Sequence, residues 1–228
     1  MTISLGGHTQ KEYDILKAFK DDEPERAFMC YIILASGSPR RSEILSRAGV
    51  SHKVIVPDIV EGLNGGRAGI RKIKEIALSK AENVRRRCKE QIPVIAADTV
   101  VCLRGRILGK PAGKTEARDM IKSLSGRWHK VITGYCVMWD ECDYICGCSV
   151  TRVRFRKLDS SVINEYIQTD EPYDKAGGYG IQSLASVFVE RISGCYCNVM
   201  GLPVSKILSM LKGHEAHMRS IQHKGDKE

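Results

Sequence analysis

Residues 32–45, IILASGSPRRSEIL, decide how the start of the fold is interpreted. The apolar run 32–35 is typical of a short strand that is buried on both faces. Residues 36–37, Ser-Gly, have the chemistry of a tight turn. Ser38 followed by Pro39 is a common way for a helix to begin. The stretch therefore predicts a strand, a turn and a helix in direct succession.

Two arginines follow at the predicted helix start. Arg40 and Arg41 would lie in the first turn, where the helix dipole is already positive and a cation is unfavourable. Free backbone N–H groups, the Ser36 hydroxyl and two guanidinium groups together make a strong anion site. The alternative is that both arginines point into water, since basic residues beside a helix start are not rare. The pattern favours an anion site.

The composition is that of an ordinary globular protein, with 228 residues, 43% hydrophobic and 28% charged. No apolar run approaches the length of a membrane span, and residues 1–29 hold no apolar core of a signal peptide, so we expect a cytoplasmic protein with reduced thiols. The nine cysteines include no CxxC pair. Cys142, Cys146 and Cys148 could gather around a metal, but half-buried residues on a hairpin are the favoured interpretation.

The net charge of +9 is compatible with nucleic acid, an anionic membrane surface or a polyphosphate substrate as partner. The basic residues are spread along the chain, and an aromatic content of 6% is low for a base-stacking platform. The alternation of Arg152, Arg154 and Arg156 with apolar residues is more typical of a solvated sheet face than of a nucleic-acid surface. Neither nucleic acid nor membrane is therefore expected as a partner.

Hydrophobic periodicity and turn residues predict the elements further along the chain. They are a strand at 50–56, a helix at 70–90, a strand at 92–97, a helix capped by Thr115, a hairpin of 128–140 and 144–156, a short helix capped by Asp159, a strand at 187–192 and a last helix ended by Gly213. Strands that alternate with helices, together with one hairpin, predict an α/β fold with a mixed sheet flanked by helices. We expect residues 30–213 to form a single domain, preceded by an extension at 1–29 and followed by a polar tail at 214–228.

Several charged residues occur at positions where burial of a charge would be costly or where a loop could contact a ligand. Lys80 lies on the apolar stripe of the predicted helix, so it needs an anion or must extend its ammonium to solvent. Asp98 ends a buried run, which is costly unless the carboxylate is paired or bound to a metal. Glu61 lies in the glycine-rich loop 57–69, and Lys110 lies beside a turn. Cations and carboxylates that converge on glycine-rich loops suit a polyphosphate with a divalent metal.

At this point the chain resembles a known family. The strings ILASGSPRRSEIL, AADTVV, ILGKP, VITG, DEPYDKAGGYGIQ and MGLPVSKIL occur in the order typical of the Maf family, across about residues 31–212. The resemblance implies a fold like that of the inosine triphosphate pyrophosphatases, with two lobes around a central cleft, and a homodimer. It also implies hydrolysis of a nucleoside triphosphate to the monophosphate and pyrophosphate, with Mg²⁺ or Mn²⁺.

Residues of this chain that match the family's motifs are expected to have the roles that those positions have in the family. The resemblance implies that Asp98 is the proton acceptor. It implies phosphate contacts at Ser36, Arg40, Arg41, Lys80 and Lys110, and metal ligands at Glu61 and Asp98. Arg40, Thr99 and Gln182 match the subfamily that acts on dTTP and UTP, with CTP and modified pyrimidine triphosphates as further candidates; the amide of Gln182 could read a pyrimidine edge. The alternative is a regulator of cell division that binds nucleic acid or a protein partner without essential catalysis.

Overall fold

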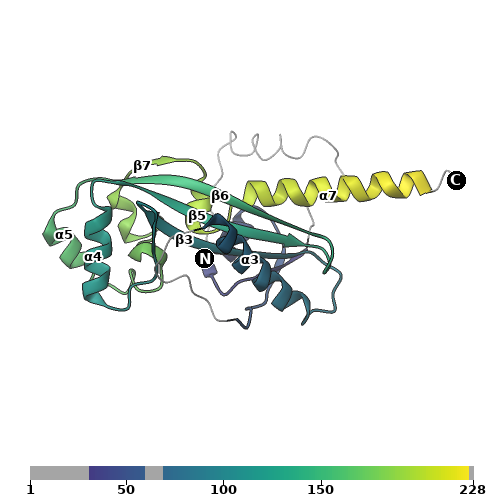
Figure 1. Cartoon of the computed structure of the whole chain (residues 1–228), viewed down its shortest axis with the longest axis horizontal. Helices are drawn as coiled ribbons and strands as arrows, with labels where there is room; N and C mark the ends of the chain where they lie inside the picture. Colours follow the sequence, from purple (N-terminus) through teal and green to yellow (C-terminus); the bar gives the residue numbers. More distant parts are fainter. Residues whose placement is uncertain (1–30, 60–68, 226–228) are drawn as a thin grey trace, which may run out of the picture.

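A mixed sheet of seven strands forms the centre of the computed structural model, which describes residues 31–59 and 69–225, with side chains as far as Met218 (Figure 1). The strand order is β2-β1-β3-β5-β6-β7, and β4 pairs with β3. The strands are β1 (Ile32–Ala35), β2 (His52–Val54), β3 (Val94–Leu103), β4 (Arg106–Leu108), β5 (Trp128–Met138), β6 (Tyr144–Phe155) and β7 (Val189–Ser193). β1 is parallel to both of its neighbours and the other pairs are antiparallel, so the predicted mixed α/β fold is confirmed.

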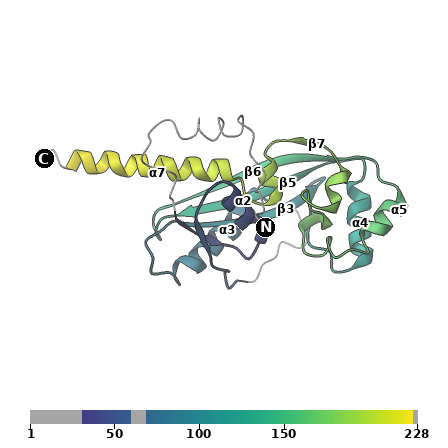
Figure 2. The ribbon, with the colours of Figure 1, turned by 180° about the vertical axis from the view of Figure 1, so that it is seen from behind.

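Helices cover the sheet in two groups, at opposite ends of the long hairpin β5–β6. The helices are α2 (Pro39–Arg47), α3 (Ile70–Arg85), α4 (Lys114–Leu124), α5 (Ser160–Tyr166), α6 (Tyr196–Met200) and α7 (Val204–Gly225), with short 3₁₀ turns η1 (Ala176–Gly178) and η2 (Leu184–Phe188). α4 and α5 form one lobe, and α2, α3 and α7 lie toward the other end (Figure 2). The two predicted lobes are present, and the cleft between them stays a prediction. In the described ranges, no helix is both long and apolar enough to cross a membrane.

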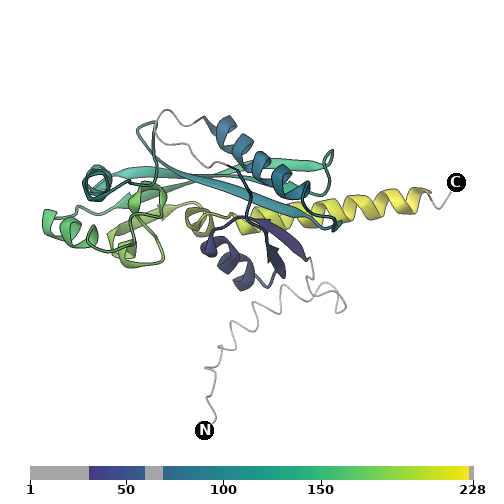
Figure 3. The same ribbon diagram turned by 90° about the horizontal axis from the view of Figure 1, so that it is seen from below.

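The strand β1 is buried on both faces, as predicted, since all four of its residues are 0% exposed. Ile32 and Leu34 pack in a cluster that includes residues of α2 and α7, whereas Ile33 and Ala35 pack with residues of α3 on the opposite face (Figure 3). Complete burial of an isoleucine or leucine side chain stabilises a fold by roughly 1.5–3 kcal/mol. Residues 32–35 are therefore central to the core.

Helix α3 packs closely on the sheet at Gly134 of β5. A Cβ atom at this position would lie 2.7 Å from the carbonyl oxygen of Ile73, closer than real Cβ contacts occur. Gly134 is the direct partner of Asp98 in the antiparallel register of β3 and β5, so the two residues lie on the same face of the sheet. The glycine therefore sets how near α3 comes to Asp98.

Asp98 does not end a strand, and that prediction is wrong. β3 continues through it because antiparallel pairing with β5 runs from Val94 to Cys102 without interruption. The parallel pairing with β1, in contrast, stops at Ala35, opposite Ala96. Asp98 therefore lies inside a strand but next to the end of its shorter neighbour, where one side of the sheet is open.

The last helix does not end at Gly213, because α7 continues to Gly225. A helix-interior glycine costs only about 1 kcal/mol relative to alanine. The next residue, His214, is held to the hairpin β5–β6: its Nε2 lies 2.6 Å from Asp143 Oδ2, and its ring stacks on Trp139 at 3.9 Å between centroids. Tertiary contacts thus extend the helix into the predicted tail.

Four other boundaries also differ from the predictions. The strand at 50–56 is shortened to β2, and the last strand is shifted slightly to β7. α4 begins at Lys114 with Gly113 as its N-cap, so Thr115 is not the cap. α3 ends at Arg85, whose buried guanidinium donates to the carbonyl of Ile92 at 2.9 Å and so turns the chain back. The domain division at 30–213 stays a prediction, and the extension at 1–29 lies outside the described residues.

Candidate active site

Lys80 and Asp98 form an ion pair between α3 and the sheet. The Lys80 side chain is 1% exposed, and its Nζ donates to Asp98 Oδ1 at 2.8 Å. The sequence left open whether Lys80 reaches solvent or has an anion, and the structure shows the anion. The Asp98 side chain is 17% exposed, so the carboxylate is accessible while the ammonium is not. Burial of a charge is tolerated only with such a partner.

Arg41 ties the turn after β1 to two distant segments. Its side chain is buried, with Nη1 donating to Ser36 Oγ at 2.8 Å and Nη2 to Thr99 Oγ1 at 3.2 Å. Its Nε donates to the carbonyl of Gly201, before α7, at 2.9 Å. The interpretation in which both arginines point into water is therefore wrong for Arg41. This guanidinium positions Ser36 and Thr99 beside the first turn of α2.

Arg40 and Gln182 each take part in a contact between α2 and the loop that contains Asp174 and Gln182. Arg40 is half-buried, with Nη1 4.0 Å from Asp174 Oδ2. Gln182 Nε2 donates to Glu43 Oε2 at 3.4 Å. The loop that contains Asp174 and Gln182 therefore lies along the start of α2. All three residues predicted to decide substrate choice gather at this helix, since Thr99 contacts Arg41.

Lys110 has no hydrogen bond or ion pair to these clusters within residues 31–59 and 69–225. Lys110 is exposed, but the preceding residue, Gly109, accepts a hydrogen bond from the Gly177 N–H at 2.8 Å. Gly177 has a φ of 73°, and a Cβ there would lie 2.9 Å from Val101, so this close approach requires glycine. Lys110 thus follows directly on a residue that contacts the glycine-rich loop 174–182. Glu61 lies outside the described residues.

Glu171 is a site-shaping residue that the sequence analysis missed. Its carboxylate accepts hydrogen bonds from three backbone N–H groups, those of Leu184 at 2.8 Å, Ala185 at 3.2 Å and Gly180 at 3.3 Å. It also accepts from the Tyr166 hydroxyl at 3.2 Å. The carboxylate therefore fixes the loop around Gln182. An acid followed closely by paired glycines, as in DEPYDKAGGYGIQ, was the available signal.

Lys175, in the same loop, was also missed. Its side chain is 13% exposed, and its Nζ donates to Asp174 Oδ1 at 2.5 Å and to the carbonyl of Glu171 at 2.9 Å. The Asp174 carboxylate thus lies between Lys175 and the more distant guanidinium of Arg40. Lys175 places a nearly buried cation in the loop that faces α2.

The site residues fit a divalent metal that arrives with a phosphorylated ligand. Asp98 Oδ1 is bound by Lys80, and Oδ2 makes no hydrogen bond within the described ranges. No group of three or more His, Cys, Asp and Glu residues forms a complete metal site in this part of the chain. Mg²⁺ is usually bound through one or two carboxylates together with substrate phosphates, so Asp98 suits it as a protein ligand.

Fold and site together define a mixed α/β protein in which cations and a carboxylate converge where a parallel strand ends and a helix begins. The chain belongs to the Maf family, because the model for Maf-like proteins matches residues 31–214. It is 46% identical over 189 residues to a dTTP/UTP pyrophosphatase of Alkaliphilus oremlandii, covering 82% of this chain and 97% of that protein. It is 42% identical over 187 residues to a dTTP/UTP pyrophosphatase of Clostridium perfringens, covering 81% and 97%.

Among solved structures, the chain is similar to a nucleoside-triphosphatase / dITP/XTP pyrophosphatase from Mycobacterium abscessus. The TM-score is 0.41 and the sequence identity 15%, covering 82% of this chain and 96% of that one. This similarity is too distant to add to the family assignment, which rests on the sequence.

Proposed function

We propose that this protein is a hydrolase that converts dTTP and UTP to the nucleoside monophosphate and pyrophosphate. The observation that carries the proposal is the Lys80–Asp98 pair at 2.8 Å, with its carboxylate accessible beside the start of α2. The names of the relatives that share 42–46% of their aligned residues with this chain support the same reaction. They give no support to a regulator without essential catalysis.

The triphosphate would bind at the N-terminal end of α2. The backbone N–H groups and the dipole of this helix favour an anion there. Arg40 and Lys110 would add positive charge near the phosphates from more exposed positions. Arg41 holds the Ser36 hydroxyl in place. The Gln182 amide offers both a donor and an acceptor to a pyrimidine edge. Its position is set by the loop that Glu171 organises.

Asp98 would accept the proton of the attacking water. Lys80 holds Oδ1, which leaves Oδ2 for the water, and a positioned general base typically contributes about 10²–10⁴-fold in rate. The water oxygen forms a bond to the α-phosphorus, and the bond from that phosphorus to the bridging oxygen of the leaving pyrophosphate breaks. The Asp98 carboxylate has lone pairs besides those used by Lys80 and the water, and together with Glu61 these would hold Mg²⁺ or Mn²⁺, which would neutralise negative charge on the phosphates.

Cytoplasmic residence and a homodimer belong to the same proposal. Both are expectations from the sequence and its resemblance to the family. Gel filtration with light scattering would test the oligomeric state, and fractionation of the source cells would test the location.

Pyrophosphate release from a panel of triphosphates tests the reaction and its specificity. With Mg²⁺ present, we expect turnover of dTTP and UTP, with CTP slower, against a blank that contains no protein. Turnover of ITP or 7-methyl-GTP alone would keep the reaction but refute the roles of Arg40, Thr99 and Gln182. No turnover of any triphosphate would overturn the proposal. Addition of EDTA should stop the reaction, and Mg²⁺ or Mn²⁺ should restore it.

A further inference from the structure

Four basic residues from three neighbouring strands form one surface, which we call the cationic face: Lys130, Arg152, Arg154 and Arg191. Lys130 lies directly opposite Arg152, and Arg154 lies directly opposite Arg191. Directly opposed residues share a side of the sheet, as do residues two apart on one strand. Lys130, Arg152 and Arg191 are exposed, and Arg154 is half-buried. The fold thus gathers cations that are up to 61 residues apart in the sequence.

The cationic face carries a charge that folding does not explain. Like charges directly opposite one another destabilise a sheet. Of the four cations, only Arg154 has a carboxylate within ion-pair distance in the described ranges, Glu190 at 3.0 Å. The guanidinium of Arg152 lies 4.8 Å from the centre of the Trp128 ring, so it is oriented by an aromatic ring and not by an anion. An anionic ligand would compensate the repulsion.

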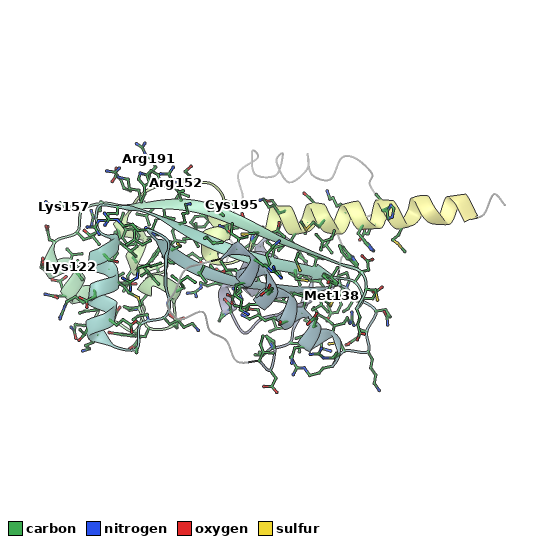
Figure 4. The ribbon with its side chains drawn as sticks, viewed as in Figure 1. Lys122, Met138, Arg152, Lys157, Arg191 and Cys195 are labelled. Carbon is green, nitrogen blue, oxygen red and sulfur yellow. The ribbon has the colours of Figure 1, made fainter. Side chains whose placement is uncertain are left out.

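A basic hollow continues the cationic face toward α4 and α5. It has a volume of about 610 Å³, and its lining includes the cations Lys122, Arg127, Arg154 and Lys157. Arg154 and Glu190 border both the hollow and the face, which makes the two surfaces continuous. Figure 4 shows Arg152 and Arg191 projecting near Lys122 and Lys157 at the same end of the molecule. None of the proposed active-site residues that the structure describes lines this hollow.

We propose that the cationic face and this hollow bind the sugar-phosphate backbone of a nucleic acid. Guanidinium groups match phosphate oxygens in pairs, and three of the four face residues are arginines. Glu190 is the one carboxylate among the described residues of the face and the lining of the hollow, so a partner of uniform negative charge matches them better than a protein surface of mixed charge. Several cations in a continuous track suit a polymer better than a single small anion. The binding is additional to the proposed hydrolysis and does not depend on it.

The position of these residues also explains why the sequence predicts no such surface. Basic residues at 130, 152, 154 and 191 look dispersed in the sequence, and the pairing of β5, β6 and β7 brings them together. The arginine stripe of β6 is solvated, as expected, but it is only the middle row of a wider patch.

Fluorescence anisotropy of a labelled 20-nucleotide single strand and of a 20-base-pair duplex, titrated with the full chain, tests the proposal. Four phosphate contacts predict a slope of log affinity against log salt of about −3 to −4, so duplex binding should weaken roughly a hundredfold between about 50 and 200 mM salt. The double variant Arg152→Glu, Arg191→Glu should bind at least about tenfold more weakly and lower the slope by about 2. Its matched control, Arg86→Glu, Lys89→Glu, makes the same charge change on exposed residues at the end of α3.

The outcomes separate the face from its alternatives. Equal loss in both double variants would mean that net charge alone attracts the nucleic acid, and the proposal would fail. It would also fail if no complex formed at low salt, if pyrophosphate displaced the strand at the hollow, or if anionic vesicles bound in preference to either oligonucleotide. Pyrophosphate release should be unchanged in both variants. If the double variant misfolds, the single variants Arg152→Ala and Arg191→Ala replace it in the test. Each should make the slope of log affinity against log salt less steep by about 0.9.

Discussion

Replacing Asp98 by asparagine should remove most of the hydrolysis and also lower the stability. Asparagine keeps an acceptor for Lys80 at the position now 2.8 Å from its Nζ, but without charge. Removing one charge of a buried ion pair typically costs about 3–5 kcal/mol, and the hydrogen bond that remains offsets part of this, so the free energy of unfolding should fall by about 2–4 kcal/mol. For a chain of this size, that corresponds to roughly 4–16 °C in melting temperature. Loss of a general base should lower kcat by about 10²–10⁴-fold.

Two measurements on the same preparations check this prediction. Pyrophosphate release at saturating dTTP gives kcat, and thermal denaturation gives the stability. A double-mutant cycle with Lys80→Met isolates the energy of the pair, which we expect to be about 1–3 kcal/mol. Glu90→Gln is a matched control, because Glu90 also binds a lysine, Lys53, at 2.8 Å, but on the surface. This variant should hydrolyse dTTP at the wild-type rate.

A specific pattern of results would refute the reasoning. If Asp98→Asn retained kcat within about tenfold of the wild type, another group would be the base. If Lys80→Met left the melting temperature unchanged and the cycle showed no coupling, the buried pair would contribute nothing to the fold.

Three further predictions concern residues around the site. Arg41→Lys should lower the free energy of unfolding by about 2–3 kcal/mol in urea denaturation, because an ammonium cannot reach all three acceptors of the planar guanidinium. Glu171→Gln should reduce the dTTP:CTP ratio of kcat/KM and speed amide hydrogen exchange at residues 180–185, because its NH₂ group would face backbone donors; unchanged exchange would contradict this role. Burial lowers the pKa of His129 from 6.5 to about 4. Protonation therefore favours the unfolded chain, and stability that is complete above pH 6.5 is lost as the pH falls toward 4. Between about pH 6.5 and 5 the loss should be about 2 kcal/mol in thermal denaturation, and His129→Leu should lack it.

The sequence predicts secondary structure best where several local signals occur close together. The succession of β1, turn and α2 follows from an apolar run, a Ser-Gly turn and a proline at the helix start, and all three lie within ten residues. Helical periodicity likewise places Lys80 on the core-facing stripe of α3. Periodicity could not name its partner, because the sheet brings Asp98 to the helix from a different element.

The errors have a common physical cause, which is tertiary contact overriding local preference. A carboxylate and a glycine were both interpreted as ends of elements. Asp98 remains within β3 because β5 supplies the ladder of hydrogen bonds and β1 ends early enough to leave room for the charge. α7 continues past Gly213 because His214 stacks on Trp139 of the hairpin. Neither the β3–β5 pairing at Asp98 nor the His214–Trp139 stacking can be inferred from the local sequence pattern.

The absence of a side chain at Gly134 has a consequence for how variants of this protein would be interpreted. Gly134 faces α3 at a separation that a single methyl group would violate, and its strand neighbour in register is Asp98. Gly134→Ala would push α3, and with it Lys80, away from the carboxylate. A misplacement of about 1 Å at a reacting group can cost about 10²-fold in rate. A mutational scan would therefore score Gly134 as essential for activity, although glycine has no functional group to offer a substrate.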